Sequence, residues 1–121
     1  MASDAAVQRL VVRHEVLDGQ PVVLFVVESD HELGSPQCSA DALLTAVGQA
    51  VDHAEGLNIG ARVFSSALLD GSRNFIEWQR AGRQLVARRQ PDELPPSLLA
   101  AELLGQSLAD YGAHDQRAVV Q

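Results

Sequence analysis

The stretch Pro21-Val22-Val23-Leu24-Phe25-Val26-Val27-Glu28 decides the fold. Its six consecutive apolar residues do not alternate with polar ones, and four of them are valines. A strand with one solvated face would alternate, so this run predicts a central strand that is covered on both faces, with helices packed over at least one side. The run is too short for a typical buried helix, and β-branched residues favour a sheet.

A hairpin is predicted on the N-terminal side of this strand. Apolar and polar residues alternate over part of residues 7–17, as in a strand with one wet face. Asp18-Gly19 follows directly, and Asp-Gly between apolar runs is a strong signal for a two-residue turn. We therefore expect this first strand to pair antiparallel with the central strand, which is expected to end near Ser29.

A helix is predicted after a loop over residues 30–38. Ser39 suits the N-cap, Asp41 suits the first turn, and Gly56 suits the C-terminal end. Cys38 then precedes the cap and is expected to pack on Leu43 as a hydrophobic staple. The apolar residues that recur at helical spacing between the caps are Leu43, Leu44, Val47, Ala50, Val51 and Ala54.

The segment 75–89 has two interpretations, and it follows a predicted strand over 61–69 and a turn at Asp70-Gly71. A helix would place Trp78 and Leu85 on one apolar stripe. A hairpin would turn at Ala81-Gly82, with Arg80 facing Arg83, Trp78 opposite Leu85, and Ile76 opposite Ala87. Gly82 would cost about 1 kcal/mol inside a helix and is favoured in a turn, so the hairpin is the preferred interpretation.

A second helix is predicted after the prolines at positions 91, 95 and 96, because proline suits the first turn of a helix. Gly112 is expected to end it. The residues of its inner stripe are Leu98, Ala101, Leu104, Leu108 and Tyr111.

The predicted fold is an α+β domain of order ββαβββα, with an antiparallel five-stranded sheet and two helices. Residues 1–6 are expected to be a loose N-terminus, 7–112 a single domain, and 113–121 a tail or a short edge strand. In the order of its elements, residues 7–112 are similar to the profilin-like group. That group includes the roadblock and longin domains, and the resemblance implies scaffolding of signalling or trafficking partners.

Composition limits the classes of function. The chain has 121 residues, which fits one domain, and a net charge of −7, which argues against general nucleic-acid binding. The charge is uneven: it sums to −7 over residues 1–60, +4 over 61–91 and −4 over 92–121. No apolar run approaches the ~20 residues needed to span a bilayer, and residues 1–13 lack the features of a signal peptide, so we expect a cytoplasmic protein that does not enter membranes.

One candidate ligand or metal loop follows the central strand. Asp30, His31, Glu32 and Cys38 are residue types that bind metals, and strand ends are common places for sites. However, the His-Glu-x-x-His pattern is absent, because Ser35 stands where the second His is needed. A solvated polar loop and a buried staple cysteine are the preferred interpretations, so no metal, cofactor or catalytic residue is assigned.

The sharpest sequence feature is a cluster of arginines around the sole tryptophan. Arg and Trp are enriched at binding hot spots, and facing arginines would favour an anion between them. The competing interpretation is a solvated hairpin tip with Arg88 paired to Glu77. The residues of this candidate partner- or anion-binding site are Trp78, Arg80, Arg83, Arg88 and Arg89.

The sequence favours a small acidic, non-catalytic interaction module, such as a signalling scaffold or an immunity-type partner of a basic protein. The alternative is a small-molecule-binding domain or small enzyme with a pocket edged by residues 30–38. We also expect a homodimer, because sheet edges tend to be covered and the basic and acidic segments are complementary.

Overall fold

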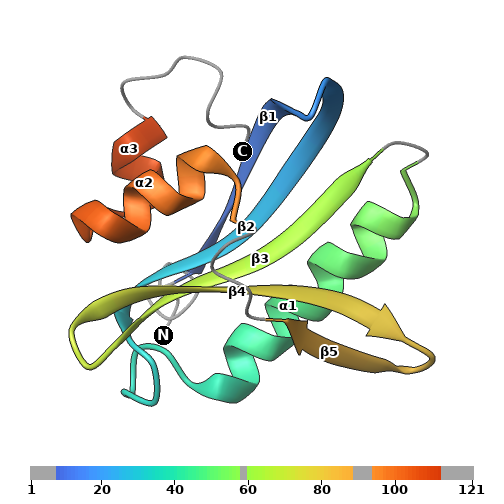
Figure 1. The fold of residues 1–121 in the computed structure, drawn as a ribbon. Helices are drawn as coiled ribbons and strands as arrows, with labels where there is room; N and C mark the ends of the chain where they lie inside the picture. Colours follow the sequence, from blue (N-terminus) through green and yellow to red (C-terminus); the bar gives the residue numbers. More distant parts are fainter. Residues whose placement is uncertain (1–7, 58–59, 89–93, 113–121) are drawn as a thin grey trace.

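A five-stranded sheet in the order β1-β2-β3-β4-β5 organises the computed structural model, which describes residues 8–57, 60–88 and 94–112. Figure 1 shows the sheet with its helices. The elements in chain order are β1 (Gln8–Leu17), β2 (Gln20–Glu32), α1 (Ala40–Glu55), β3 (Ala61–Leu69), β4 (Ser72–Ala81), β5 (Gln84–Arg88), α2 (Pro96–Leu104) and α3 (Leu108–Gly112).

The sheet is mixed, because β2 and β3 run parallel while every other neighbouring pair is antiparallel. The prediction of an antiparallel sheet is therefore wrong at this one joint. The reason is α1, which carries the chain from the end of β2 back toward its start. As a result β3 begins with Ala61 beside Val23 and continues in the same direction as β2.

Two-residue turns make the antiparallel joints. Asp18-Gly19 has φ angles of 52° and 78°, and Asp70-Gly71 has 52° and 79°. Two positive φ angles in succession are the signature of a type I′ turn, whose twist matches that of the flanking strands. The hairpins predicted at both Asp-Gly pairs are confirmed.

The apolar run of β2 is buried on both faces, as its lack of alternation predicted. Phe25 and Val27 belong to a core cluster with α1, whereas Leu24 and Val26 belong to a second cluster with α2 and α3. Figure 1 shows α1 on one side of the sheet and α2 and α3 on the other. The described part of the chain therefore forms a single α+β domain with two core layers.

The first helix begins after Ser39 and ends before Gly56, as predicted from these two capping residues. The Ser39 hydroxyl accepts a hydrogen bond from the Ala42 amide at 3.1 Å, and Gly56 follows the last helical residue. α1 directs Leu43, Val47 and Val51 into the core. No described helix combines the length and the apolar character needed to cross a membrane.

The C-terminal part of the domain contains two helices, so the single predicted helix is wrong. Gly105 adopts a left-handed conformation, with φ at 64°, and ends α2. The Ser107 hydroxyl then accepts a hydrogen bond from the Asp110 amide at the start of α3. Because the chain changes direction here, Leu104 does not continue an inner stripe and is 69% exposed, whereas Leu98 and Leu108 are buried.

Candidate interaction groove

An apolar groove of about 460 Å³ lies between the N-terminal half of α1 and strands β3 and β4. Its walls are mainly aliphatic, with one aromatic ring. The side chains that form most of the lining are Leu33, Leu43, Leu44, Leu69, Ile76 and Trp78.

The groove exists because one helix is too narrow to cover this face of the sheet. A helix with its side chains is about 10 Å wide, whereas neighbouring strands are about 4.8 Å apart, so α1 covers roughly two strands. It packs on β2 and β3, and the hairpin of β4 and β5 contacts it further along, where Arg80 binds Asp52 and Glu55. The face of β4 beside the start of α1 stays open, and Ile76 and Trp78 are only half-buried there.

The apolar lining of the groove is partly exposed to solvent, while the polar groups inside the groove are already bonded. Leu44 is 39% exposed and Leu69 is 46% exposed. Trp78 Nε1 donates to Ser65 Oγ at 2.9 Å, and the Asn74 amide donates to a backbone carbonyl of its own strand. An occupant would therefore be held mainly by apolar contact.

Of the charged residues next in sequence to the groove lining, only Arg73 is basic, and it is buried. Asp41 follows the lining residue Ala40, Asp70 follows Leu69, and Glu32 precedes Leu33. The Glu32 carboxylate accepts hydrogen bonds from the backbone amides of Asp70 and Gly71 at 2.8 and 2.9 Å, which places two of these acids together at the turn between β3 and β4. We call Glu32, Asp41 and Asp70 the acidic rim.

The predicted hairpin over residues 75–89 is confirmed by the pairing of β4 with β5, but its predicted register is wrong by two residues. Arg80 lies opposite Leu85, and Trp78 lies opposite Ala87. The loop residues are Gly82 and Arg83, with a positive φ of 65° at Gly82 alone, as in a type II′ turn. The facing pair of Arg80 and Arg83 is therefore not formed.

The structure separates the predicted arginine cluster. Arg80 pairs with acidic residues of α1, and Arg83 is exposed at the hairpin tip. Arg88 lies opposite Glu77 in the ladder and donates to Gln79 Oε1 at 3.5 Å, and Arg89 lies outside the described residues. Of the predicted set only Trp78 lines the apolar groove.

The predicted ligand loop is also dispersed. β2 continues through Asp30, His31 and Glu32, because these residues remain extended beyond the expected strand end at Ser29. Asp30 bonds to Arg73, Glu32 holds the β3–β4 turn, and His31 is exposed. Cys38 is fully buried. Among the residues that the structure describes, no three His, Cys, Asp or Glu side chains are grouped to hold a metal ion.

A buried ionic cluster under α3 was not predicted. Arg73 is 3% exposed in its side chain and donates to the Ser29 carbonyl at 2.7 Å and to Asp30 at 2.9 Å. Glu28 is fully buried, 3.8 Å from Arg73 and 3.4 Å from Arg9. The sequence contained little signal for it: Glu28 directly follows the apolar run of β2, but Arg73 lies in a strand with several other polar residues.

Two carboxyl groups of this cluster have shifted pKa values of opposite sign. Burial raises the pKa of Glu28, and the Leu108 amide and the nearby Arg9 and Arg73 charges only partly oppose it. Burial acts in the same direction on Asp30, but hydrogen bonds from both arginines outweigh it and lower the pKa. The cluster joins β1, β2, β4 and α3, and its contacts are all within the fold.

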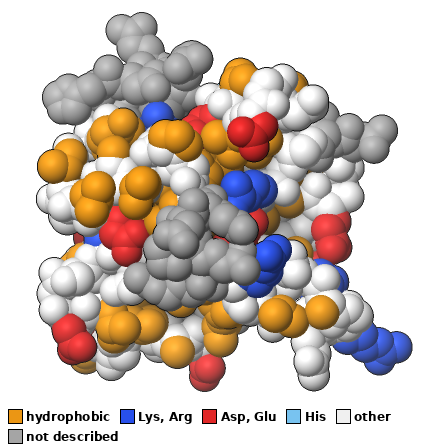
Figure 2. Space-filling model, viewed as in Figure 1, with side chains coloured by type: hydrophobic (Ala, Val, Ile, Leu, Met, Phe, Trp, Pro, Cys, Tyr) orange, Lys and Arg blue, Asp and Glu red, His pale blue; other side chains and the backbone are white. Residues whose placement is uncertain are grey.

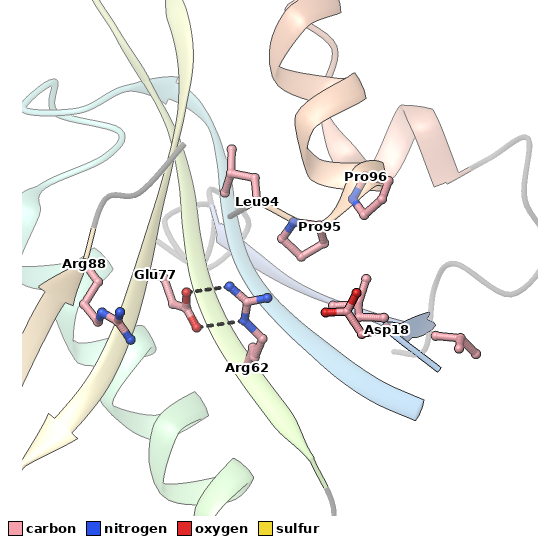
Figure 3. A pocket seen from close by; sticks show the side chains of 9 residues that line it. Asp18, Arg62, Glu77, Arg88, Leu94, Pro95 and Pro96 are labelled. Atoms are coloured by element: carbon pink, nitrogen blue, oxygen red, sulfur yellow. Dashed lines mark hydrogen bonds and ion pairs between the residues drawn. The ribbon is translucent and has the colours of Figure 1, made fainter. Parts of the chain in front are cut away.

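A second hollow, of about 720 Å³, lies on the opposite side of the sheet beside the start of α2. Figure 3 shows the ion pair on its wall, in which Arg62 donates to both Glu77 oxygens, at 2.9 and 2.7 Å. Asp18, Leu94 and Pro96 lie around it. The Arg62–Glu77 pair is satisfied within the fold, whereas the apolar groove has exposed apolar side chains in its lining, so the groove is the stronger candidate site.

Exposed leucines form a further apolar surface on α2. Leu99, Leu103 and Leu104 are 39%, 78% and 69% exposed. Figure 2 shows hydrophobic side chains gathered over this part of the molecule. None of these leucines lines the apolar groove.

No known protein family, curated protein or solved structure shows detectable similarity to this chain. A functional assignment therefore rests on the residues and geometry described above.

Proposed function

We propose that this protein is a non-catalytic interaction module that binds a partner protein through the apolar groove. The observation that carries this proposal is the groove itself, a mainly aliphatic hollow whose lining includes the exposed side chains of Leu44 and Leu69. Contiguous exposed apolar surface around a recess is typical of interaction sites.

The polar groups of the groove favour a protein segment over a small molecule. Small-molecule sites usually combine an apolar lining with a few convergent polar groups that orient the ligand. Here the Trp78 indole N–H is bonded to Ser65, and Asp30, Glu32 and Cys38 are engaged or buried elsewhere. Apolar anchors of a partner chain need only shape complementarity and burial.

A small-molecule-binding domain is the second candidate, and one observation favours it. The volume of about 460 Å³ lies within the range of ligand pockets, and Leu33 and Ala40 place the groove beside the loop expected to edge such a pocket. Native mass spectrometry of the purified protein tests this candidate, because a retained ligand adds a discrete mass.

Affinity capture from the source cell tests the interaction function. The baits are the wild-type chain, Leu44→Asp in the groove, and Leu103→Asp on α2 as the matched control. We expect a protein partner to be retained by the wild type and by Leu103→Asp, and lost by Leu44→Asp, because a carboxylate in the groove would be desolvated on binding.

Circular dichroism establishes that each bait is folded. Equal retention of every captured protein by all three folded baits would contradict binding through the groove. Capture of no protein, together with a bound small molecule in the mass spectrum, would favour the second candidate.

A further inference from the structure

We propose that the groove accepts a basic amphipathic segment, whose apolar side chains fill the hollow while its Lys or Arg residues face the acidic rim. This inference rests on the proposed function and specifies the class of partner. It is carried by three acidic residues that are next in sequence to apolar lining residues, two of which, Asp41 and Asp70, are exposed.

The shape of the groove suits side chains that project from one face of a segment. Leu43 and Leu44 on α1 form one wall, and Leu69 and Ile76 on the strands contribute to the other. A helix that lies in such a groove presents anchors at positions i, i+3, i+4 and i+7. The polar face of the bound helix stays in solvent. Lys or Arg residues at the boundary between its apolar and polar faces would then lie near the acidic rim.

The rim gives the groove a preference for cations. Asp41 and Asp70 are exposed, and Glu32 is held beside Asp70 by its bonds to the turn amides. The sequence contains no Lys or Arg between Arg13 and Arg62, a stretch that includes β2 and all of α1. Charge complementarity of this kind raises association rates and disfavours partners of the same sign.

The arginines close to the groove in sequence do not offset the rim. Arg73 is buried and directed to Ser29 and Asp30, whereas Arg80 binds Asp52 and Glu55 on α1. An acidic peptide or an anionic membrane would therefore be repelled by the exposed carboxylates of Asp41 and Asp70. Both are outcomes that the following experiment distinguishes from a basic segment.

Trp78 provides a direct readout, because it is the sole tryptophan of the chain and lines the groove. The probes are three helical peptides of about 16 residues, a length near the minimum for a stable isolated helix, without aromatic residues. The first combines a leucine stripe with lysines, the second combines the same stripe with glutamates, and the third keeps the lysines but replaces the leucines with serines.

We expect the leucine–lysine peptide to shift Trp78 emission saturably, and the leucine–glutamate peptide to bind at least about tenfold more weakly. The serine–lysine peptide is expected to cause no shift. Vesicles of anionic lipid are expected to leave the emission unchanged. Equal affinity for the first two peptides, or a saturable response to the serine–lysine peptide or the vesicles, would overturn the inference.

Variants of the rim test the role of its charges. Asp41→Asn with Asp70→Asn should weaken binding of the leucine–lysine peptide by about three- to tenfold, since each exposed pair is weak. Asp18→Asn is the matched control, because Asp18 and Asp70 occupy the same position of a type I′ turn with the same φ of 52°, and Asn tolerates that conformation. An equal effect of the control would contradict a local role of the rim.

The two proposals fail in different ways. If the leucine–glutamate peptide binds as well as the leucine–lysine peptide and Leu44→Asp abolishes both, the groove remains an interaction site and only its charge preference is wrong. If no peptide shifts Trp78 and Leu44→Asp retains every captured protein, the interaction function itself is wrong.

Discussion

The carboxylate of Glu28 ties the C-terminal helices to the sheet. Its two oxygens accept hydrogen bonds from the backbone amides of Leu108 and Ala109, at the start of α3. Arg9 and Arg73 lie within 3.4 and 3.8 Å of it and balance part of its charge. A buried carboxylate with these partners is structurally important, yet its ionisation in the interior is costly.

The raised pKa of Glu28 predicts a gain in stability on mild acidification. The folded state holds a proton on Glu28 at pH values where the unfolded chain, with a pKa near 4.5, has released it. The contribution of Glu28 to the free energy of unfolding therefore grows as the pH falls from about 7 toward 4.5. We expect Glu28→Gln to lack this gain in urea titrations at several pH values.

Asp30→Asn is the matched comparison, because the pKa of Asp30 is lowered and its contribution has the opposite sign. The stabilisation by Asp30 is present above its unfolded pKa of about 3.9 and is lost as the pH falls through the folded value. If the wild type instead loses stability relative to Glu28→Gln on acidification, the pKa of Glu28 is lowered and not raised. The arginines and backbone amides would then affect this pKa more than burial does.

At the scale of elements, substitution of alanine for glycine is predicted to have opposite effects on stability at two positions. Gly48 lies within α1, and a Cβ there would meet Leu85 Cδ1 at 3.7 Å, an ordinary contact. Gly48→Ala should therefore stabilise the fold by up to about 1 kcal/mol through helix propensity. Gly82→Ala should destabilise it by about 1 kcal/mol, because Gly82 has a φ of 65° that alanine adopts at a cost.

Thermal unfolding monitored by circular dichroism measures both variants against the wild type. Because no heavy atom lies within 4 Å of a Cβ built on Gly82, a loss of stability there reports on backbone conformation and not on a steric clash. A stabilising effect of Gly82→Ala would contradict the turn at Gly82-Arg83.

Elements defined by local chemistry were predictable from the sequence. Asp18-Gly19 and Asp70-Gly71 specify type I′ turns, and Ser39 specifies the start of α1, because each signal acts within a few residues. The register of the β4–β5 hairpin was not predictable in this way. Gly82 is compatible with a turn at Ala81-Gly82 and with one at Gly82-Arg83, and only the second gives the observed pairing.

Features that depend on distant segments were missed. The parallel pairing of β2 with β3 follows from the path of α1. The end of α2 was missed although Gly105 is a local signal for it. Of the residues of the candidate site, Trp78 was identified from the sequence, but the reason was the presence of arginines near it and not an apolar groove. The groove that it lines arises from the placement of α1 over β2 and β3, which no single segment encodes.

At the scale of the whole molecule, the sheet has two edges, and homodimer formation remains a prediction. Within the described residues, β1 and β5 each pair with one strand only, so each has an unpaired edge. β1 is the longer of the two, with ten residues. A long edge strand is a template for pairing with another chain. Arg62, Arg73 and Arg80 are paired within the fold, so we now expect the edge of β1, and not the basic segment, to mediate association.

Light scattering across a concentration series measures this association. We expect a dimer for the wild type and a monomer for the double variant Leu10→Lys with Val16→Lys, because lysines on an edge strand oppose pairing. These two side chains are 41% and 70% exposed, so the variant should fold. A monomer at every concentration of the wild type would contradict the prediction.

The single parallel joint between β2 and β3 also divides the chain into two ribbons with different folding requirements. β1 with β2, and β3 with β4 and β5, are joined by two-residue turns and can form from local contacts within microseconds. The joint between the ribbons brings together residues as distant as Val23 and Ala61, at the entropic cost of closing a long loop through α1. We therefore expect the pairing of β2 with β3, which α1 connects, to be the step that limits the rate of folding.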